Sequence, residues 1–119
     1  MTDSGESSGN QTPRLVEGLS LRACIGVSGM IVSASRSWRS LLGWNRADLA
    51  QGAFVERVHP DDVDTVVGAI HRVYYSGASA DFMCRYARKA GGYALVAWQA
   101  IPRRDVQFID LQGKVTSSQ

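Results

Sequence analysis

Cysteine is scarce in this sequence, and its scarcity excludes several kinds of small protein. The chain of 119 residues contains only two cysteines, Cys24 and Cys84, which lie far apart and in no Cys-x-x-Cys pair. A disulfide framework or a zinc cluster needs more cysteines at closer spacing. We therefore predict two free thiols and no metal site.

Long hydrophobic runs are also missing. The longest apolar stretch, from Tyr93 to Trp98, is far shorter than the roughly 20 residues that span a bilayer. The first residues, MTDSGESSGNQTPR, lack the basic and apolar regions of a secretory signal. These features predict a cytoplasmic protein with no membrane segment.

The charge balance gives no positive sign of nucleic-acid binding, which is left as the least favoured alternative function. Lys and Arg number 13 and Asp and Glu 11, a net charge of +2, and the basic residues are scattered along the chain. Hydrophobic residues make up 45% of the chain, enough for the core of one domain. We predict a polar, flexible tail or cap at residues 1–18, a domain at 19–115, and a polar end or the start of a linker at 116–119.

Strands and short helices are predicted in the first half of the chain. Apolar residues alternate with polar ones over 19–27, and β-branched residues follow at 30–32, a pattern that indicates a hairpin. Apolar residues at helical spacing predict a short helix over 35–43. Asn45 followed by Asp48 is close to a capping box and predicts a second short helix.

The longest helix is predicted from Pro60 to Ser76. Pro60 suits the first helical position, and the two aspartates after it place negative charge at the positive end of the helix dipole. Apolar residues then form one stripe, and Gly77 ends the helix. The stripe consists of Val63, Val66, Val67, Ile70 and Tyr74.

Three strands are predicted after this helix, at 82–87, 93–101 and 106–111. The second of them is apolar on both faces, with Val96 and Trp98 on one face, so both of its faces must be covered. The element order predicts an α+β fold, in which a five-stranded antiparallel sheet carries several short helices and one longer helix on one face.

Three segments together have the pattern of one known family. GMIVSASRSWRSLLGWNRADL is similar to a glycine turn and strand that lead to a short helix, "LLG", an aromatic residue and a capped turn. VHPDDVDTVVGAIHRVYYSG is similar to a His-Pro-Asp-Asp segment with its long helix, and RYARKAGGYALVAW to a strand hairpin. In this order, from about Leu19 to Val115, they resemble the PAS domain family. Ser35, where the family usually has Asn, and Ala90, where it usually has Asp, depart from its pattern.

The resemblance implies a sensory or protein-interaction module of signal transduction. Domains of this family as a rule carry no catalytic groups, and they are usually attached to a kinase, a cyclase, a transcription regulator or a chemoreceptor. The resemblance therefore implies that the chain is not an enzyme and acts through an output domain or a partner protein.

A ligand pocket is expected between the longest helix and the sheet. Its lining is almost entirely apolar, so its ligand would be hydrophobic or a flat aromatic molecule. Dense packing of the same side chains, which would leave no space for a ligand, is the alternative. The candidate pocket residues are Val66, Val67, Ile70, His71, Phe82, Cys84, Val96 and Trp98.

The other face of the sheet is expected to carry a hydrophobic patch, which a monomer rarely leaves open. In PAS relatives an N-terminal helix or a second subunit covers this face, and the apolar residues before the first strand are too few to do so alone. We therefore predict a homodimer. The candidate dimer face consists of Leu15, Val16, Tyr93, Leu95 and Ala97.

No cofactor is predicted. His59, beside two aspartates, is interpreted as a helix cap. His71 could ligate haem iron, but the ligand of haem-binding relatives lies earlier on this helix. Light-sensing flavin relatives carry a cysteine in a motif similar to NCRFLQ, which this sequence lacks, and Cys84 is interpreted as a small buried thiol on the inner face of a central strand. A haem-binding sensor stays open as an alternative within the family.

A small cone-shaped isomerase or dehydratase is the alternative outside the family, because it too places a curved sheet over helices. Such an enzyme needs an inward-facing carboxylate or histidine as a base, and the expected inner positions carry none. No nucleophile, base and orienting group can be assembled from the sequence, so no catalytic residue is predicted.

Overall fold

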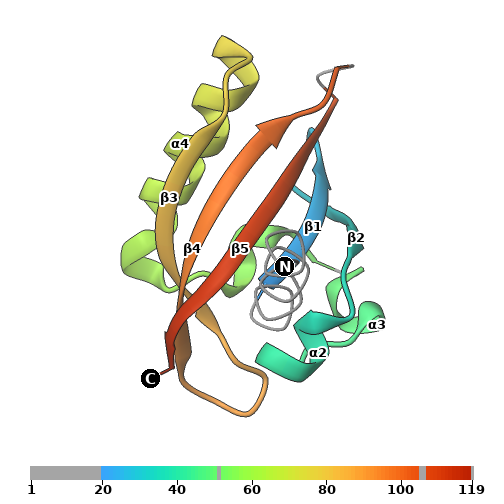
Figure 1. Cartoon of the computed structure of the whole chain (residues 1–119), viewed down its shortest axis with the longest axis vertical. Coiled ribbons are helices and arrows are strands. Elements are labelled where there is room, and N and C mark those ends of the chain that lie inside the picture. Colours follow the sequence, from blue (N-terminus) through green and yellow to red (C-terminus); the bar gives the residue numbers. More distant parts are fainter. Residues whose placement is uncertain (1–19, 51, 105–106, 119) are drawn as a thin grey trace, which may run out of the picture.

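A computed structural model describes residues 20–50, 52–104 and 107–118 (Figure 1). The predicted tail at 1–18 lies outside the described residues, and so do Leu15 and Val16 of the candidate dimer face.

These residues form two strands, then three α-helices and two 3-10 turns, and then three further strands, labelled as in Figure 1. They are β1 (Ser20–Gly26), β2 (Ile31–Ala34), α2 (Ser37–Leu42), α3 (Arg46–Leu49), η1 (Phe54–Arg57), η2 (Pro60–Asp62), α4 (Val63–Ser76), β3 (Ala80–Ala87), β4 (Tyr93–Pro102) and β5 (Phe108–Ser118).

The strands form one antiparallel sheet in the order β2-β1-β5-β4-β3. The last three strands are a meander, and β1 joins them through β5. Helix α4 contacts β3 and β4, α2 contacts β1, and α3 contacts β2. Figure 1 shows α4 running along the β3 side of the sheet and the short helices near β2. The predicted α+β fold, with one longer helix among several short ones, is confirmed.

Local chemistry sets the ends of the two short helices, as predicted. Gly43 ends α2 in the left-handed region, with φ of 91°, and its N–H donates to the carbonyl of Trp38 at 3.0 Å. Asn45 and Asp48 form a reciprocal capping box at the start of α3. The end of α2 and the start of α3 each depend on residues that are close together in the sequence, so both could be predicted from the sequence.

The start of α4 differs from its prediction by one turn. Pro60 begins a 3-10 turn, and regular α-helix begins only at Val63. His59 caps the turn as interpreted, because its Nδ1 accepts the Asp61 N–H at 3.1 Å. The predicted apolar stripe faces the core in part, because Val66 is buried and Val63, Ile70 and Tyr74 pack against the core while partly exposed. The fully buried face of α4 is shifted from the centre of the stripe. That face consists of Val66, Ala69 and Val73.

Two strands differ from the sequence interpretation. Strand β5 runs to Ser118, beyond the predicted end at 111, because it pairs with β4 over almost its whole length. Strand β3, which carries Cys84, is an edge strand and not a central one. Its open edge is partly covered by a bridge between Val58 and Tyr86 and by the His59 N–H, which donates to the β3 backbone.

The core between sheet and helices is dominated by four aromatic side chains. Trp38 and Tyr86 meet edge to face with ring centroids 5.3 Å apart, and Phe54 and Trp98 do so at 5.0 Å. The Tyr86 hydroxyl donates to the Phe54 carbonyl at 2.8 Å, so this buried polar group is satisfied. The four rings fill the centre of the molecule between α2, η1 and the β3–β4 pair.

Candidate functional site

The structure divides the candidate pocket residues between two places. Five of them lie in the core, where the sheet faces the helices, and the other three lie at the outer flank of α4. On β3 and β4, Phe82 faces Trp98 and Cys84 faces Val96. The five core members are Val66, Phe82, Cys84, Val96 and Trp98.

The core members leave little chemistry available. Cys84 is buried, and burial raises the pKa of its thiol to about 12, so the thiol stays protonated at neutral pH. The indole N–H of Trp98 is buried and has no hydrogen-bond partner among the described residues. This interior can hold an apolar group but offers no nucleophile.

A groove beside α4 collects the other three candidates. It has a volume of about 470 Å³ and lies between the helix and the β1–β2 turn. Tyr74 anchors the turn to the helix, because its hydroxyl donates to the Gly26 carbonyl at 2.8 Å. The groove is lined by Val27, Ser28, Gly29, Val55, Val67, Ile70, His71, Tyr74 and Tyr75.

Most of this lining is apolar and open to solvent. Val67 is 40% exposed, Val27 70% and Tyr75 83%, although all three are hydrophobic. His71 is exposed, and its ring contacts that of Tyr75 at 5.3 Å. The turn residues of the groove were not predicted, because no local signal shows that the β1–β2 turn packs against a helix distant in the sequence.

The outer face of the sheet carries the rest of the candidate dimer face. Tyr93, Leu95 and Ala97 are half-buried along β4, and Met83 on β3 is 50% exposed. An open hollow of about 640 Å³ lies on the same face. Its lining is Ser20, Asp81, Phe82, Met83, Ala97, Trp98, Gln99, Gln112, Gly113 and Lys114.

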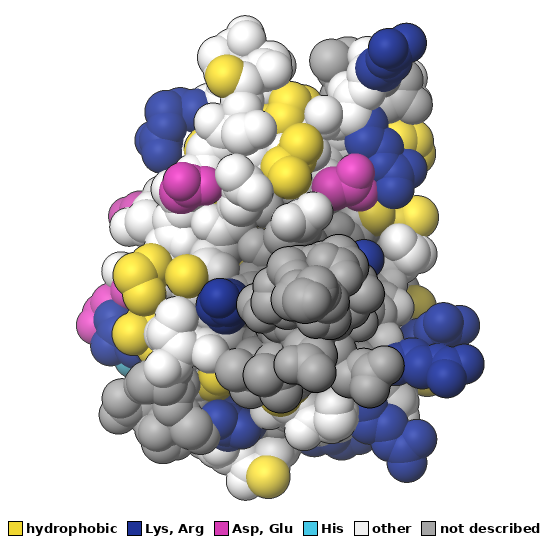
Figure 2. All heavy atoms as spheres, viewed as in Figure 1, with side chains coloured by type: hydrophobic (Ala, Val, Ile, Leu, Met, Phe, Trp, Pro, Cys, Tyr) yellow, Lys and Arg dark blue, Asp and Glu magenta, His cyan; other side chains and the backbone are white. Residues whose placement is uncertain are grey.

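Figure 2 views the molecule from this side. On the part of the face that remains visible, hydrophobic side chains lie singly or in small groups among polar and charged ones. Across the sheet, Leu95 of β4 pairs with Arg85 on β3 and Ala97 pairs with Lys114 on β5, so the apolar residues of β4 form a narrow strip with polar borders.

One ion pair holds the edge of this face to the segment before α4. The Arg85 guanidinium binds the Asp62 carboxylate at 2.9 Å, and the Arg85 backbone N–H donates to the same carboxylate at 2.8 Å. These contacts lower the pKa of Asp62 to about 2. The pair joins η2 to β3 and leaves no free acid or base at this point.

Metal chemistry and membrane insertion find no support in residues 20–50, 52–104 and 107–118. No group of three or more His, Cys, Asp or Glu in these ranges could hold a metal ion. Within the same ranges, no helix has both the length and the hydrophobicity needed to cross a bilayer.

Comparisons with known proteins give a consistent result. A family model described as "PAS fold" matches residues 31–108. No curated protein sequence matches the chain. Two solved structures of Drosophila melanogaster Cycle PAS-B are similar, one wild type with bound ethylene glycol and one a tryptophan-to-alanine variant with bound glycerol. Each has a TM-score of 0.69 and 14% identity, and the match covers 80% of this chain and 98% of that chain. Identity this low shows a likeness of fold alone.

Proposed function

The chain belongs to the PAS fold family, and from this premise we propose that it is a non-catalytic signalling module that pairs with a second copy of itself. The pairing surface is the outer face of the sheet, around β4. The output is carried by a partner protein or an attached domain, such as a kinase, a cyclase or a transcription regulator. The signal is a shift between two ways in which the sheet packs against the second copy. A ligand or partner causes this shift by binding one of the two states more tightly than the other.

The observation that carries this proposal is the apolar strip on β4. Leu95 and Ala97 lie on β4, the second strand from one edge, between β3 and β5, and both are only half-buried. Met83 extends the strip onto β3. Polar residues such as Gln99 and Gln112 border the strip, as in interfaces with a hydrophobic centre and a polar rim.

Light scattering of two variants tests the pairing. We expect the wild type to be a dimer at micromolar concentration and Leu95→Arg to be a monomer, because the substitution buries an unpaired charge in the interface. Val67→Arg is the matched control, since it places the same side chain on the opposite side of the molecule and should leave the dimer intact. A wild type that stays monomeric at high micromolar concentration contradicts the proposal.

We further propose that a small hydrophobic or flat aromatic ligand binds in the groove beside α4. The volume of about 470 Å³ lies in the range of small-molecule sites, and the walls are formed mostly by valines and tyrosines. The Ser28 hydroxyl and the His71 ring are the polar groups that would orient a ligand there.

The fluorescence of N-phenyl-1-naphthylamine, a neutral aromatic probe, tests this second part. We expect saturable binding to the wild type, a loss of roughly tenfold in affinity for Val67→Arg, and no change for Leu95→Arg. Equal binding by all three proteins would contradict a site in this groove.

The absence of catalysis and the cytoplasmic location are part of the same proposal. The Cys84 thiol is protonated and buried, and His59 is engaged as a cap, so neither is available as a nucleophile or base. Both cysteines are free thiols, which is compatible with a reducing compartment.

A further inference from the structure

The segment from β1 to the start of α3 carries basic residues and no acidic ones. Between Ser20 and Ala47 the sequence contains no Asp, Glu or Lys but four arginines, Arg22, Arg36, Arg39 and Arg46. All four are exposed. In the described part of the chain, no acidic side chain forms an ion pair with any of them. Their positive charge is therefore not neutralised within this part of the protein.

The fold brings these arginines around two adjoining hollows. One hollow, of about 380 Å³, is lined by Arg36, Arg39 and Arg46 together with Ser35, Trp44 and Asn45. The other, of about 340 Å³, is lined by Arg22 with Ser20, Ser35 and Ser37. Ser35 borders both hollows, and we call the two together the arginine groove. Figure 2 shows Lys and Arg side chains gathered at the lower right, on the side of α2 and α3, with no acidic side chain beside them.

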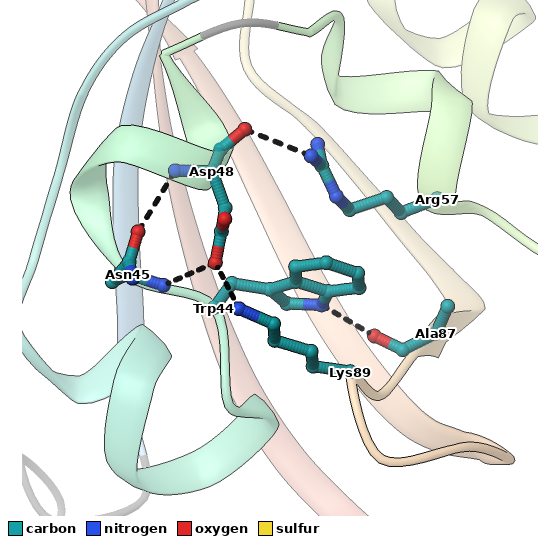
Figure 3. A network of polar contacts seen from close by, with 6 residues as sticks. All are labelled: Trp44, Asn45, Asp48, Arg57, Ala87 and Lys89. Carbon is teal, nitrogen blue, oxygen red and sulfur yellow. Dashed lines mark hydrogen bonds and ion pairs between the residues drawn. The ribbon is translucent and has the colours of Figure 1, made fainter.

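Trp44, which lines the arginine groove, is held by contacts to other parts of the fold (Figure 3). The Trp44 indole N–H donates to the Ala87 carbonyl at 2.8 Å, and the Arg57 guanidinium lies 4.5 Å from the centre of the Trp44 ring. Arg57 also donates to the Asp48 carbonyl at 2.9 Å. Trp44 is thus held in place by contacts to β3 and η1, and no large rearrangement is needed to offer it to a ligand.

Two acidic residues lie near these arginines, and both are bound by other cations. Asp48, on α3, is bound by Lys89 at 2.9 Å and by the backbone N–H of Asn45 at 3.2 Å, and these two hydrogen bonds lower its pKa. Asp110 lines a hollow together with Arg22 and Ser35, and it forms an ion pair with Arg103 at 3.0 Å. The surface around the arginine groove therefore attracts anions.

We infer that the arginine groove docks an acidic peptide segment of a partner protein. Guanidinium groups bind carboxylates through paired hydrogen bonds, and serine hydroxyls and the Asn45 amide supply further donors. Trp44 offers an apolar contact for one side chain of the peptide. The docking surface lies on the β1–α3 side of the molecule, and it does not depend on the proposed dimer or on the ligand groove.

The charge distribution favours a peptide over a nucleic acid. Single-stranded nucleic acids are bound by several aromatic platforms along a positive channel. Here Trp44 is the single aromatic residue in the lining of the arginine groove, and one of its faces is covered by Arg57. The net charge of the chain is only +2, which is low for a protein that binds the phosphate backbone over a long stretch.

Fluorescence anisotropy with a labelled hexaglutamate peptide tests the inference. We expect saturable binding to the wild-type chain at low salt and weaker binding at physiological salt, because exposed charges are screened. The double variant Arg36→Ala/Arg39→Ala should bind about tenfold more weakly, since each exposed charge pair contributes a factor of roughly three. Arg46→Ala, an independent variant, should lose about threefold.

A matched control separates local docking from overall charge. Arg72→Ala/Arg104→Ala removes the same two charges from exposed positions outside the arginine groove and should leave binding unchanged. Equal losses in the two double variants, no binding to the wild type, or tighter binding of oligothymidylate than of hexaglutamate would overturn the inference. Light scattering of the same samples reports the dimer separately, so failure of one proposal does not imply failure of the other.

Discussion

The six-membered ring of Trp98 lies directly against Gly113 on the neighbouring strand. The two residues are partners across β4 and β5, and a Cβ placed on Gly113 would come within 2.5 Å of two ring carbons of Trp98. Any residue larger than glycine at this position would displace the ring, which also packs against Trp38 and Phe54. One missing side chain on β5 thus makes room for the aromatic core.

Gly113→Ala should therefore destabilise the protein by about 3 kcal/mol, because neither the ring nor the strand can move without disturbing the core. Urea unfolding followed by tryptophan fluorescence measures the difference in free energy of unfolding. Gly68→Ala is the matched control. Its new Cβ would meet only the end of the Arg72 side chain at 3.7 Å, and alanine favours a helix interior, so we expect a gain of roughly 0.5–1 kcal/mol. Similar effects of the two substitutions would contradict this account of the core.

Stability should depend on pH through Asp62. Its pKa is lowered by Arg85 to about 2, below its ordinary value of 3.8, so the folded state binds this proton less readily than the unfolded state. The contribution of the carboxylate is complete above the ordinary value and is lost as the pH falls from 3.8 to about 2. Asp62→Asn should cost about 1 kcal/mol at neutral pH and nothing in strong acid.

The control for this pH dependence is Asp61→Asn, an exposed neighbour whose side chain makes no ion pair with a described residue. We expect it to follow the wild-type curve of unfolding free energy against pH. If the free energies of unfolding of the wild type and of Asp62→Asn still differ in strong acid, the charge of Asp62 is not the cause of the difference.

Neither thiol should react with dithionitrobenzoate in the folded protein at mildly alkaline pH. Cys24 and Cys84 are both buried, and burial raises the pKa of Cys84 to about 12. Guanidinium chloride should expose both, and two thiols per chain should then react rapidly. Stoichiometric reaction of Cys84 in the native state, detected by comparison with Cys84→Ser, would contradict its placement in the core.

The two partners of Asp48 should differ in their contribution to stability. Asn45→Ala removes the side chain that caps α3, at a cost of about 1 kcal/mol. Lys89→Ala removes an ion pair whose lysine is 50% exposed, and solvent screening makes its cost smaller than that of the lost cap. Thermal unfolding of both variants compares their losses of stability. A larger loss for Lys89→Ala would mean that the ion pair to the β3–β4 turn stabilises α3 more than its cap does.

Long-range pairing decided what could not be predicted about the sheet. The length of β5 depends on β4, since the polar residues beyond Leu111 read as a loop until their strand partners are known. The position of β3 at the edge depends on the strand order, which several arrangements of the same five segments could satisfy. Neither property is encoded in a short stretch of residues.

The candidate sites show the same division. Burial of Phe82, Cys84, Val96 and Trp98 follows from strand alternation, so the sequence places them correctly on one face. The position of Val67 in a solvent-open groove does not follow from the helical stripe, because it depends on which side of α4 the sheet covers.

The sequence by itself determined the family, the element order and the helix ends other than the start of α4, because a glycine or a capping side chain acts on the backbone within one turn. Only the tertiary structure decided which surfaces exist. The groove beside α4 joins a helix to a turn more than 35 residues earlier, and the arginine groove gathers β1, α2 and α3 around one hollow. Each of these surfaces is formed by segments that are far apart in the sequence. Strand pairing brings those segments together, and the local residue pattern does not specify that pairing.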